Sequence, residues 1–298
     1  MKIKANGIEI EVEDTGADGS QAGRPVVMLI MGLGMQLVAW PPALVNALVA
    51  DGYRVVRHDN RDIGLSQHFK HLGTQNIIWT SLKLKLGLPV TPPYTLKDMA
   101  ADAIGVLDAL HIPKAHIVGV SMGGMIAQRV ALAAPDKVLS LTSIMSTSGA
   151  RGLPEAQPRV LKALFTRPAG TDMEAIVAHF VNLYRVIGSP GFPVDEVALR
   201  AHISLGLQRS YNPTGTLRQM VAIGADTGKR AQELGRINRP TLVLHGKADP
   251  LVPFACGEDT ARRIPGAKLV GIDGMGHDLP PGVVDQVIRY TLPHLKAA

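Results

Sequence analysis

The sequence contains 298 residues, of which 46% are hydrophobic and 19% are charged. These proportions exclude an intrinsically disordered chain and predict one large α/β domain or two smaller units. The net charge is +6, but lysine and arginine are scattered, with pairs such as Lys229–Arg230 as the longest clusters. A basic surface exposed to solvent fits this pattern better than a nucleic-acid-binding patch.

The chain has one cysteine, Cys256, so no intramolecular disulfide can form, which fits a reducing compartment. Its first residues, MKIKANGIEIEVEDTG, include no apolar core of the length found in signal peptides. It also has no run of about 18 apolar residues, the length that spans a membrane. We therefore expect a cytoplasmic protein that neither binds nor crosses a membrane.

Residues 2–13 alternate between apolar and charged side chains around a turn signal at Asn6–Gly7, which predicts an antiparallel hairpin at a sheet edge. Continuous apolar runs follow, as expected of strands that are buried on both faces. They predict strands at 25–31, 53–59, 115–120, 137–145, 240–246 and 267–273. Apolar spacing predicts helices at 43–52, from Thr95 onward, at 122–134 and at 283–292.

Strands that alternate with helices indicate a mostly parallel sheet with helices on both faces. Residues 146–229 break this alternation, because they contain short helical patterns separated by prolines. We expect this segment to form a helical cap over the carboxyl ends of the strands, where ligands bind in open α/β sheets. The core would then consist of residues 1–145 and 230–298. The stretch 66–93 gives no clear assignment.

The stretch GVSMGG at 119–124 places one serine between glycines, directly after the strand predicted at 115–120. A Gly-x-Ser-x-Gly pattern between a buried strand and a helix predicts a nucleophile elbow, the sharp turn that presents a catalytic serine. The glycines keep side chains out of the crowded contact between strand and helix. The amino end of the helix from Met122 favours developing negative charge. Ser121 is therefore the candidate nucleophile.

A serine nucleophile requires a histidine base, which follows the serine in the chain in this type of sheet. His277 lies in the loop GMGHDLP, directly after the strand predicted at 267–273. The other histidines after Ser121 are interpreted as structural or surface residues: His179, His202, His245 and His294. We predict that His277 is the base.

The carboxylate that orients the base is expected at the end of the preceding strand. Asp249 follows the strand predicted at 240–246, in the stretch LVLHGKADP. Asp273 and Asp278 are alternatives, but both lie too near His277 in sequence to come from a different strand. Asp249 would hold the tautomer of His277 and stabilise its imidazolium form.

Two backbone N–H groups should stabilise the oxyanion of the tetrahedral intermediate. We assign them to Met122, the residue after the nucleophile, and to Leu33 in the loop MGLGM at 31–35. Alternatively, this loop starts a dinucleotide-binding turn, but position 37, where the third glycine belongs, is leucine.

The stretch HDNRDIGLS at 58–66 ends the strand predicted at 53–59. His58, Asp59 and Asp62 could form a metal site, but no further cluster of ligands supports this reading. We interpret the stretch as a polar loop that supports the oxyanion turn. No metal and no organic cofactor is expected.

Five stretches, taken in order, resemble the α/β-hydrolase superfamily over nearly the whole chain: LIMGLGMQLVAWP, RHDNRDIGLS, GVSMGG, LHGKADPLVP and GMGHDLP. Met31–Gly32, where most hydrolases have His-Gly, and Trp40–Pro41 resemble the aclacinomycin methylesterase group and related carboxylesterases. The resemblance implies the roles given above for the same residues: Ser121, Asp249, His277, Leu33 and Met122. The segment 146–229 matches poorly, so the anthracycline substrate is not implied.

We therefore expect a serine carboxylesterase that forms an acyl-enzyme and hydrolyses it with water. The apolar content of the cap predicts a hydrophobic small-molecule ester. Perhydrolases, haloperoxidases and carbon–carbon bond hydrolases use the same triad and are alternatives. A non-catalytic small-ligand binding protein on the same scaffold is less favoured, since all three triad candidates are present. The sequence also allows a homo-oligomer.

Overall fold

The structure is a computed structural model that describes residues 1–74, 76–86, 88 and 90–298. The described strands form an eight-stranded sheet in the order β1-β2-β4-β3-β5-β6-β7-β8. They are β1 (Lys2–Ala5), β2 (Ile8–Asp14), β3 (Val26–Ile30), β4 (Arg54–His58), β5 (Ala115–Val120), β6 (Val138–Ile144), β7 (Thr241–Gly246) and β8 (Lys268–Ile272). All neighbours from β4 to β8 pair in parallel, which confirms the predicted mostly parallel sheet.

The amino-terminal hairpin lies at one edge of the sheet, as its alternating sequence predicts. β1 pairs antiparallel with β2, and β2 pairs antiparallel with β4. The turn between β1 and β2 places Asn6 at φ 49° and Gly7 at φ 78°. Both values lie in the left-handed region that asparagine and glycine tolerate best, so the turn follows directly from these two residues.

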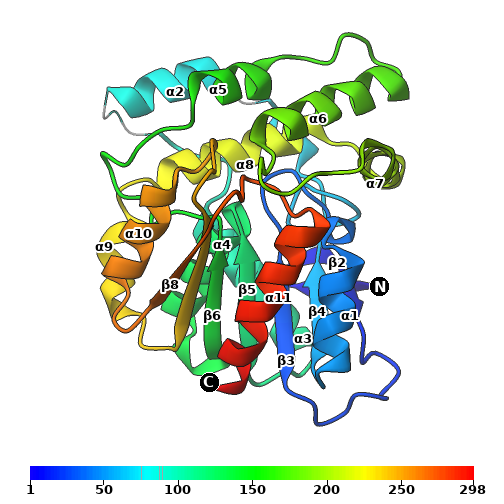
Figure 1. The fold of residues 1–298 in the computed structure, drawn as a ribbon, viewed down its shortest axis with the longest axis vertical. Coiled ribbons are helices and arrows are strands. Elements are labelled where there is room, and N and C mark those ends of the chain that lie inside the picture. Colours follow the sequence, from blue (N-terminus) through cyan, green and yellow to red (C-terminus); the bar gives the residue numbers. More distant parts are fainter. Residues whose placement is uncertain (75, 87, 89) are drawn as a thin grey trace.

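Helices cover both faces of the sheet (Figure 1). They are α1 (Pro42–Ala50), α3 (Leu96–Ala109), α4 (Met122–Ala133), α10 (Phe254–Arg263) and α11 (Pro281–Lys296). α1 and α11 pack on one face, against a core that includes Val27 and Leu29. α3 and α4 pack on the other face, against a core that includes Met28 and Ile30. Successive residues of β3 thus enter different cores, which is why its sequence is continuously apolar.

The segment between β6 and β7 contains helices and no strand among its described residues. Its helices are α5 (Pro158–Phe165), α6 (Met173–Ile187), α7 (Glu196–Arg209), α8 (Pro213–Asp226) and the short α9 (Arg230–Glu233). α5, α6, α7 and α8 lie on the side of the sheet where the parallel strands end (Figure 1). This edge is the one at which the sequence places its candidate site residues.

Outside the segment 146–229, two helices of 9 and 10 residues are absent from the sequence-based assignment. α2 (Ile77–Lys85) occupies part of the unassigned stretch 66–93 and packs against α8. Three residues of that stretch, 75, 87 and 89, lie outside the described residues. α10 packs against β7 and β8 through small or polar buried residues such as Cys256 and Thr260, so its sequence contains few large apolar residues.

Every helix in the described part of the chain is too short or too polar to cross a bilayer.

Candidate active site

Ser121 occupies the sharp turn between β5 and α4. Its backbone has φ 55° and ψ −121°, a conformation that is strained for a residue with a side chain. Hydrogen bonds hold the turn on both sides: the Ser121 N–H donates to the carbonyl oxygen of Ile144 at 2.9 Å. The Ser121 carbonyl accepts from Gly124 N at 2.9 Å and from the Ser146 hydroxyl at 2.7 Å. The surrounding structure therefore fixes the strained backbone that presents the hydroxyl.

The glycines on either side of Ser121 make this turn sterically feasible. A Cβ atom at Gly119 would lie 2.1 Å from the carbonyl oxygen of Gly123. A Cβ atom at Gly123 would lie 2.0 Å from the carbonyl oxygen of Ile30 in β3. Neither position can hold a larger residue unless the backbone moves. The Gly-x-Ser-x-Gly pattern thus reflects the close approach of α4 to β5 and β3.

The three side chains that the sequence singles out form one continuous chain of hydrogen bonds. The Ser121 Oγ lies 2.9 Å from His277 Nε2, and His277 Nδ1 lies 2.7 Å from Asp249 Oδ2. His277 is 8% exposed and Asp249 is 5% exposed, so water screens this chain only weakly. The three residues come from separate loops. Ser121 and His277 are 156 positions apart in sequence, and Asp249 and His277 are 28 positions apart.

The loop after β7 holds the carboxylate of Asp249. Its Oδ1 accepts hydrogen bonds from the backbone N–H groups of Leu251, at 2.9 Å, and Val252, at 2.8 Å. Its Oδ2 is left to accept from His277. Two donors on one oxygen fix the position of the carboxylate, which selects the orientation of the imidazole ring.

The loop that carries His277 contacts the end of α6. The His277 backbone N–H donates to the Ile187 carbonyl at 2.7 Å, and the Gly276 N–H donates to the Ser189 hydroxyl at 2.8 Å. A Cβ atom at Gly276 would lie 2.3 Å from the carbonyl oxygen of Gly188. The helical segment therefore helps to place the imidazole, a connection that the sequence does not reveal.

None of the hydrogen bonds described for the other histidines after Ser121 involves the Ser121 hydroxyl. His245 is fully buried at the end of β7, and its Nε2 lies 2.7 Å from the Val252 carbonyl oxygen. The nearest approach of that nitrogen to Asp249 is 3.7 Å. His294 lies on α11, with its Nε2 3.2 Å from the Leu141 carbonyl oxygen. His179 and His202 lie on α6 and α7.

The two alternative carboxylates pair with groups other than His277. Asp273 is exposed and forms an ion pair with Lys247 at 3.0 Å. Asp278 is buried, and the Ser189 hydroxyl donates a hydrogen bond to its Oδ1 at 2.5 Å. Burial raises the pKa of Asp278 to about 6. The structure thus brings Asp249, and neither alternative, to Nδ1 of His277.

The turn at 31–35 lies directly against Ser121. A Cβ atom at Gly32 would lie 3.2 Å from the Ser121 Cβ, so a side chain there would crowd the serine. Leu33 is the next residue of this turn, and Met122, the residue after Ser121, begins α4. Gly32 of this turn thus lies against Ser121, while Leu33 and Met122 follow Gly32 and Ser121 directly in sequence.

The polar loop after β4 forms ion pairs with the helical segment through two buried aspartates. Asp59 accepts hydrogen bonds from the backbone of Leu37 at 2.7 Å and Leu65 at 2.9 Å, and pairs with Arg209 of α7 at 2.6 Å. Asp62 pairs with Arg218 of α8 at 2.7 Å. These arginines carry no sequence signal, because each meets its carboxylate only after the chain has folded.

The same loop offers no support for a metal site. His58 is fully buried, and burial lowers its pKa to about 4. The carboxylates of Asp59 and Asp62 already accept hydrogen bonds from arginine side chains, and that of Asp59 also accepts from backbone N–H groups. Across residues 1–74, 76–86, 88 and 90–298, no group of three or more His, Cys, Asp or Glu side chains is arranged to hold a metal ion.

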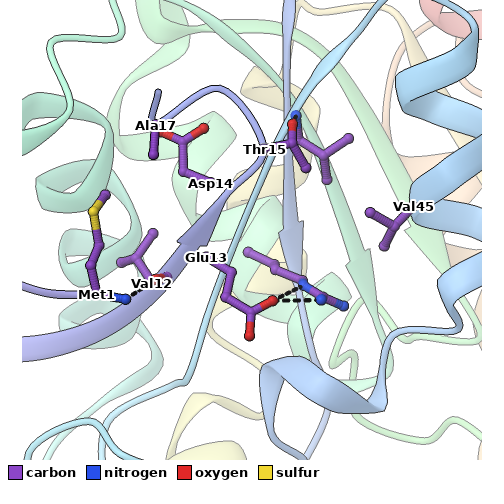
Figure 2. A pocket seen from close by; sticks show the side chains of 9 residues that line it. Met1, Val12, Glu13, Asp14, Thr15, Ala17 and Val45 are labelled. Atoms are coloured by element: carbon purple, nitrogen blue, oxygen red, sulfur yellow. Dashed lines mark hydrogen bonds and ion pairs between the residues drawn. The ribbon is translucent and has the colours of Figure 1, made fainter. Parts of the chain in front are cut away.

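Figure 2 shows a second region, a surface hollow beside β2 and β4 that is separate from the site around Ser121. The Arg57 guanidinium donates to Glu13 Oε2 at 3.0 Å within it, and the amino group of Met1 donates to the Val12 carbonyl at 2.7 Å. None of its lining residues belongs to the site around Ser121. The hollow places no group suited to catalysis opposite another, so we assign it no role.

Comparison with known proteins identifies the family. Residues 25–187 match the family model of the alpha/beta hydrolase fold, and residues 223–292 match that of TAP-like proteins. The rhodomycin D methylesterase DauP of Streptomyces sp. (strain C5) is 30% identical, over 94% of this chain and 93% of that protein. The chain belongs to the α/β-hydrolase family. As a member it is a hydrolase, and the predicted family and fold class are confirmed.

Solved structures agree with this fold over the full length of the α/β-hydrolase. The enol-lactonase from Burkholderia xenovorans LB400 superposes with a TM-score of 0.71 at 22% identity, over 99% of this chain and 100% of that one. A meta-cleavage product hydrolase from Pseudomonas fluorescens IP01 (the S103A mutant) gives a TM-score of 0.74 at 20% identity, over 100% and 97%. At these identities the likeness concerns the fold alone.

Proposed function

We propose that this α/β-hydrolase is a serine carboxylesterase in which Ser121, His277 and Asp249 form the catalytic triad. The observation that carries the proposal is the hydrogen-bonded chain from Ser121 Oγ through His277 to Asp249, with the serine held at a strained elbow. The 30% identity to a protein named rhodomycin D methylesterase supports an ester as the substrate.

In the proposed mechanism His277 Nε2 accepts the hydroxyl proton of Ser121 as its oxygen attacks the ester carbonyl carbon. The tetrahedral oxyanion accepts hydrogen bonds from the backbone N–H groups of Leu33 and Met122. The carbon–oxygen bond to the alcohol then breaks, and His277 returns the proton to the leaving alcohol. Water attacks the acyl-enzyme and gives a proton to His277. His277 returns this proton to the Ser121 oxygen as the bond between that oxygen and the acyl carbon breaks, which releases the carboxylic acid and the free serine. Asp249 stabilises the imidazolium at each step.

We further propose that residues 146–229 act as a cap over this site and that the substrate is a hydrophobic small-molecule ester. α5, α6, α7 and α8 lie beyond the strand ends that carry the triad, which supports this placement. The contacts of Ile187 and Ser189 with the His277 loop support a direct link between the cap and the catalytic base. The mechanism requires no metal and no organic cofactor.

The proposal is tested by turnover of p-nitrophenyl and methyl esters of graded acyl length, with Ser121→Ala as the matched variant. The wild-type protein should hydrolyse at least one ester and react with a fluorophosphonate probe. Ser121→Ala should lose both properties, with kcat lower by several orders of magnitude, while its circular dichroism and melting temperature stay unchanged. Hydrolysis of a β-diketone instead of any ester would indicate a carbon–carbon bond hydrolase. Well-folded protein that neither reacts nor turns over substrate would indicate a ligand-binding role.

A further inference from the structure

Gln219 connects the helical segment to the turn beside the nucleophile. This glutamine lies on α8 and is fully buried. Its Oε1 accepts a hydrogen bond from the backbone N–H of Gly34 at 3.0 Å, and its Nε2 donates to the Arg61 carbonyl at 3.0 Å. One amide group therefore bridges the turn at 31–35 and the polar loop after β4.

α8 also packs directly against this turn. Gly34 has φ +68°, and a Cβ atom there would lie 3.0 Å from the Thr216 hydroxyl oxygen. Thr216 and Gln219 are three residues apart, so they project from the same face of α8. The turn is therefore in contact with the side of the helix that carries both residues.

Neighbouring contacts hold α8 in place. Arg218 forms two hydrogen bonds to the Asp62 carboxylate, at 2.7 and 2.8 Å, with both side chains buried. A Cβ atom at Gly215 would lie 2.5 Å from the Asp62 carbonyl oxygen, so the helix and the loop after β4 are in close contact. Gln219 is thus a fixed support, since neither its helix nor its second partner can shift without breaking buried contacts.

The two ends of the turn are held by different parts of the chain. Asn60 donates to the Met31 carbonyl at 2.9 Å, and Gln219 accepts from Gly34. Leu33, whose N–H is the proposed oxyanion donor, lies between these two attachments. An oxyanion donor is effective only within about 2.7–3.1 Å of the position that the oxyanion takes, so the placement of this turn affects the rate.

We propose that Gln219 is a positioning residue that holds the oxyanion turn in its catalytic geometry, so that the helical segment contributes to catalysis as well as to substrate enclosure. The inference rests on the proposed function, because it assumes that Leu33 donates to an ester-derived oxyanion. Gln219 itself need not touch the substrate. Its loss should therefore weaken stabilisation of the transition state more than binding of the ground state.

The test compares Gln219→Met with Asn212→Ala. Methionine keeps the length of the side chain and removes both hydrogen bonds. Asn212 caps the same helix, through its contact with Gly215 N at 3.3 Å, and donates to the Asp62 carbonyl at 2.8 Å, but forms no hydrogen bond to residues 31–35. Both variants should have lower melting temperatures. Gln219→Met should lower kcat about tenfold or more with KM within about threefold, whereas Asn212→Ala should keep kcat within about twofold.

Affinity for a trifluoromethyl ketone inhibitor adds a readout that a purely structural role would not change. It should fall in Gln219→Met by the same factor as kcat/KM. If the methionine variant does not fold, Gln219→Asn, which withdraws the amide by one methylene, takes its place with the same expectation. Equal melting temperatures of the two variants combined with an unchanged kcat in Gln219→Met would overturn the inference and leave the proposed function intact.

Failure of the proposed function gives a different result, since the wild-type protein would then hydrolyse no ester. In that case the rate of fluorophosphonate labelling of Ser121 replaces kcat, because the transition state of phosphonylation, before fluoride leaves, also carries a negatively charged oxygen that the N–H groups of Leu33 and Met122 would stabilise. Slower labelling of Gln219→Met than of Asn212→Ala would still support the positioning role. Equal labelling rates would refute it.

Discussion

Asp278, the neighbour of the proposed base, gives a quantitative test of how burial acts at this site. Asp278 is 6% exposed, and burial raises its pKa from the ordinary value of 3.8 to about 6. The hydrogen bond from Ser189 acts in the opposite direction, since it favours the ionised carboxylate. The folded protein therefore keeps this proton over a pH range in which the unfolded chain has already lost it.

The perturbation is Asp278→Asn, which keeps an oxygen acceptor for Ser189 and cannot ionise. A rise from 3.8 to about 6 corresponds to about 2 pH units, or about 3 kcal/mol at ~1.36 kcal/mol per unit. Because the folded-state pKa is raised, this stabilisation is complete below pH ~4 and is lost as the pH rises through about 6. Between pH ~4 and pH ~7, the wild-type protein should lose up to about 3 kcal/mol of stability relative to the variant.

The assay is urea unfolding of both proteins at several pH values across this window, read as the difference in the free energy of unfolding. Taking the difference removes the contribution of groups that titrate identically in the two proteins. Ser189→Ala should be measured in the same way, because it removes a hydrogen bond that favours the charged form of Asp278. In this variant the loss of stability should extend to higher pH. A difference that stays constant with pH would refute the reasoning. A difference of opposite sign would mean that the native structure stabilises the carboxylate.

Two further predictions concern the proposed acid and the attachment of the helical segment. Asp249→Asn should lower kcat roughly 10⁴-fold in steady-state assays if it fixes the tautomer of His277, and near wild-type turnover would assign that role to another group. Arg218→Met should lower the free energy of unfolding by about 3–5 kcal/mol, because it leaves Asp62 buried without its partner. Adding Asp62→Asn should recover part of that loss in a urea titration, and a single-variant loss below about 1 kcal/mol would show that the pair does not stabilise the fold.

The strands of the sheet could be predicted closely because burial on both faces requires continuous apolar runs. The strand predicted at 115–120 is β5 (Ala115–Val120), and the strand predicted at 25–31 is β3 (Val26–Ile30). α10 was missed because its buried residues are small or polar and the helix contains few large apolar residues. α2 was missed because its leucines and lysines alternate without a clear helical period.

The sequence by itself determined the chemistry available to this protein: an elbow serine between glycines, and a histidine and an aspartate that each follow a strand. These positions can be read because parallel strands end at one edge of a sheet, so local motifs predict which loops meet. Only the tertiary structure decided which polar residues support them. Gln219, Arg218 and Ser189 meet their partners across 87 to 185 residues of chain, and those pairings depend on how α6 and α8 lie over the sheet. No local pattern specifies that placement, because it results from the packing of the whole helical segment.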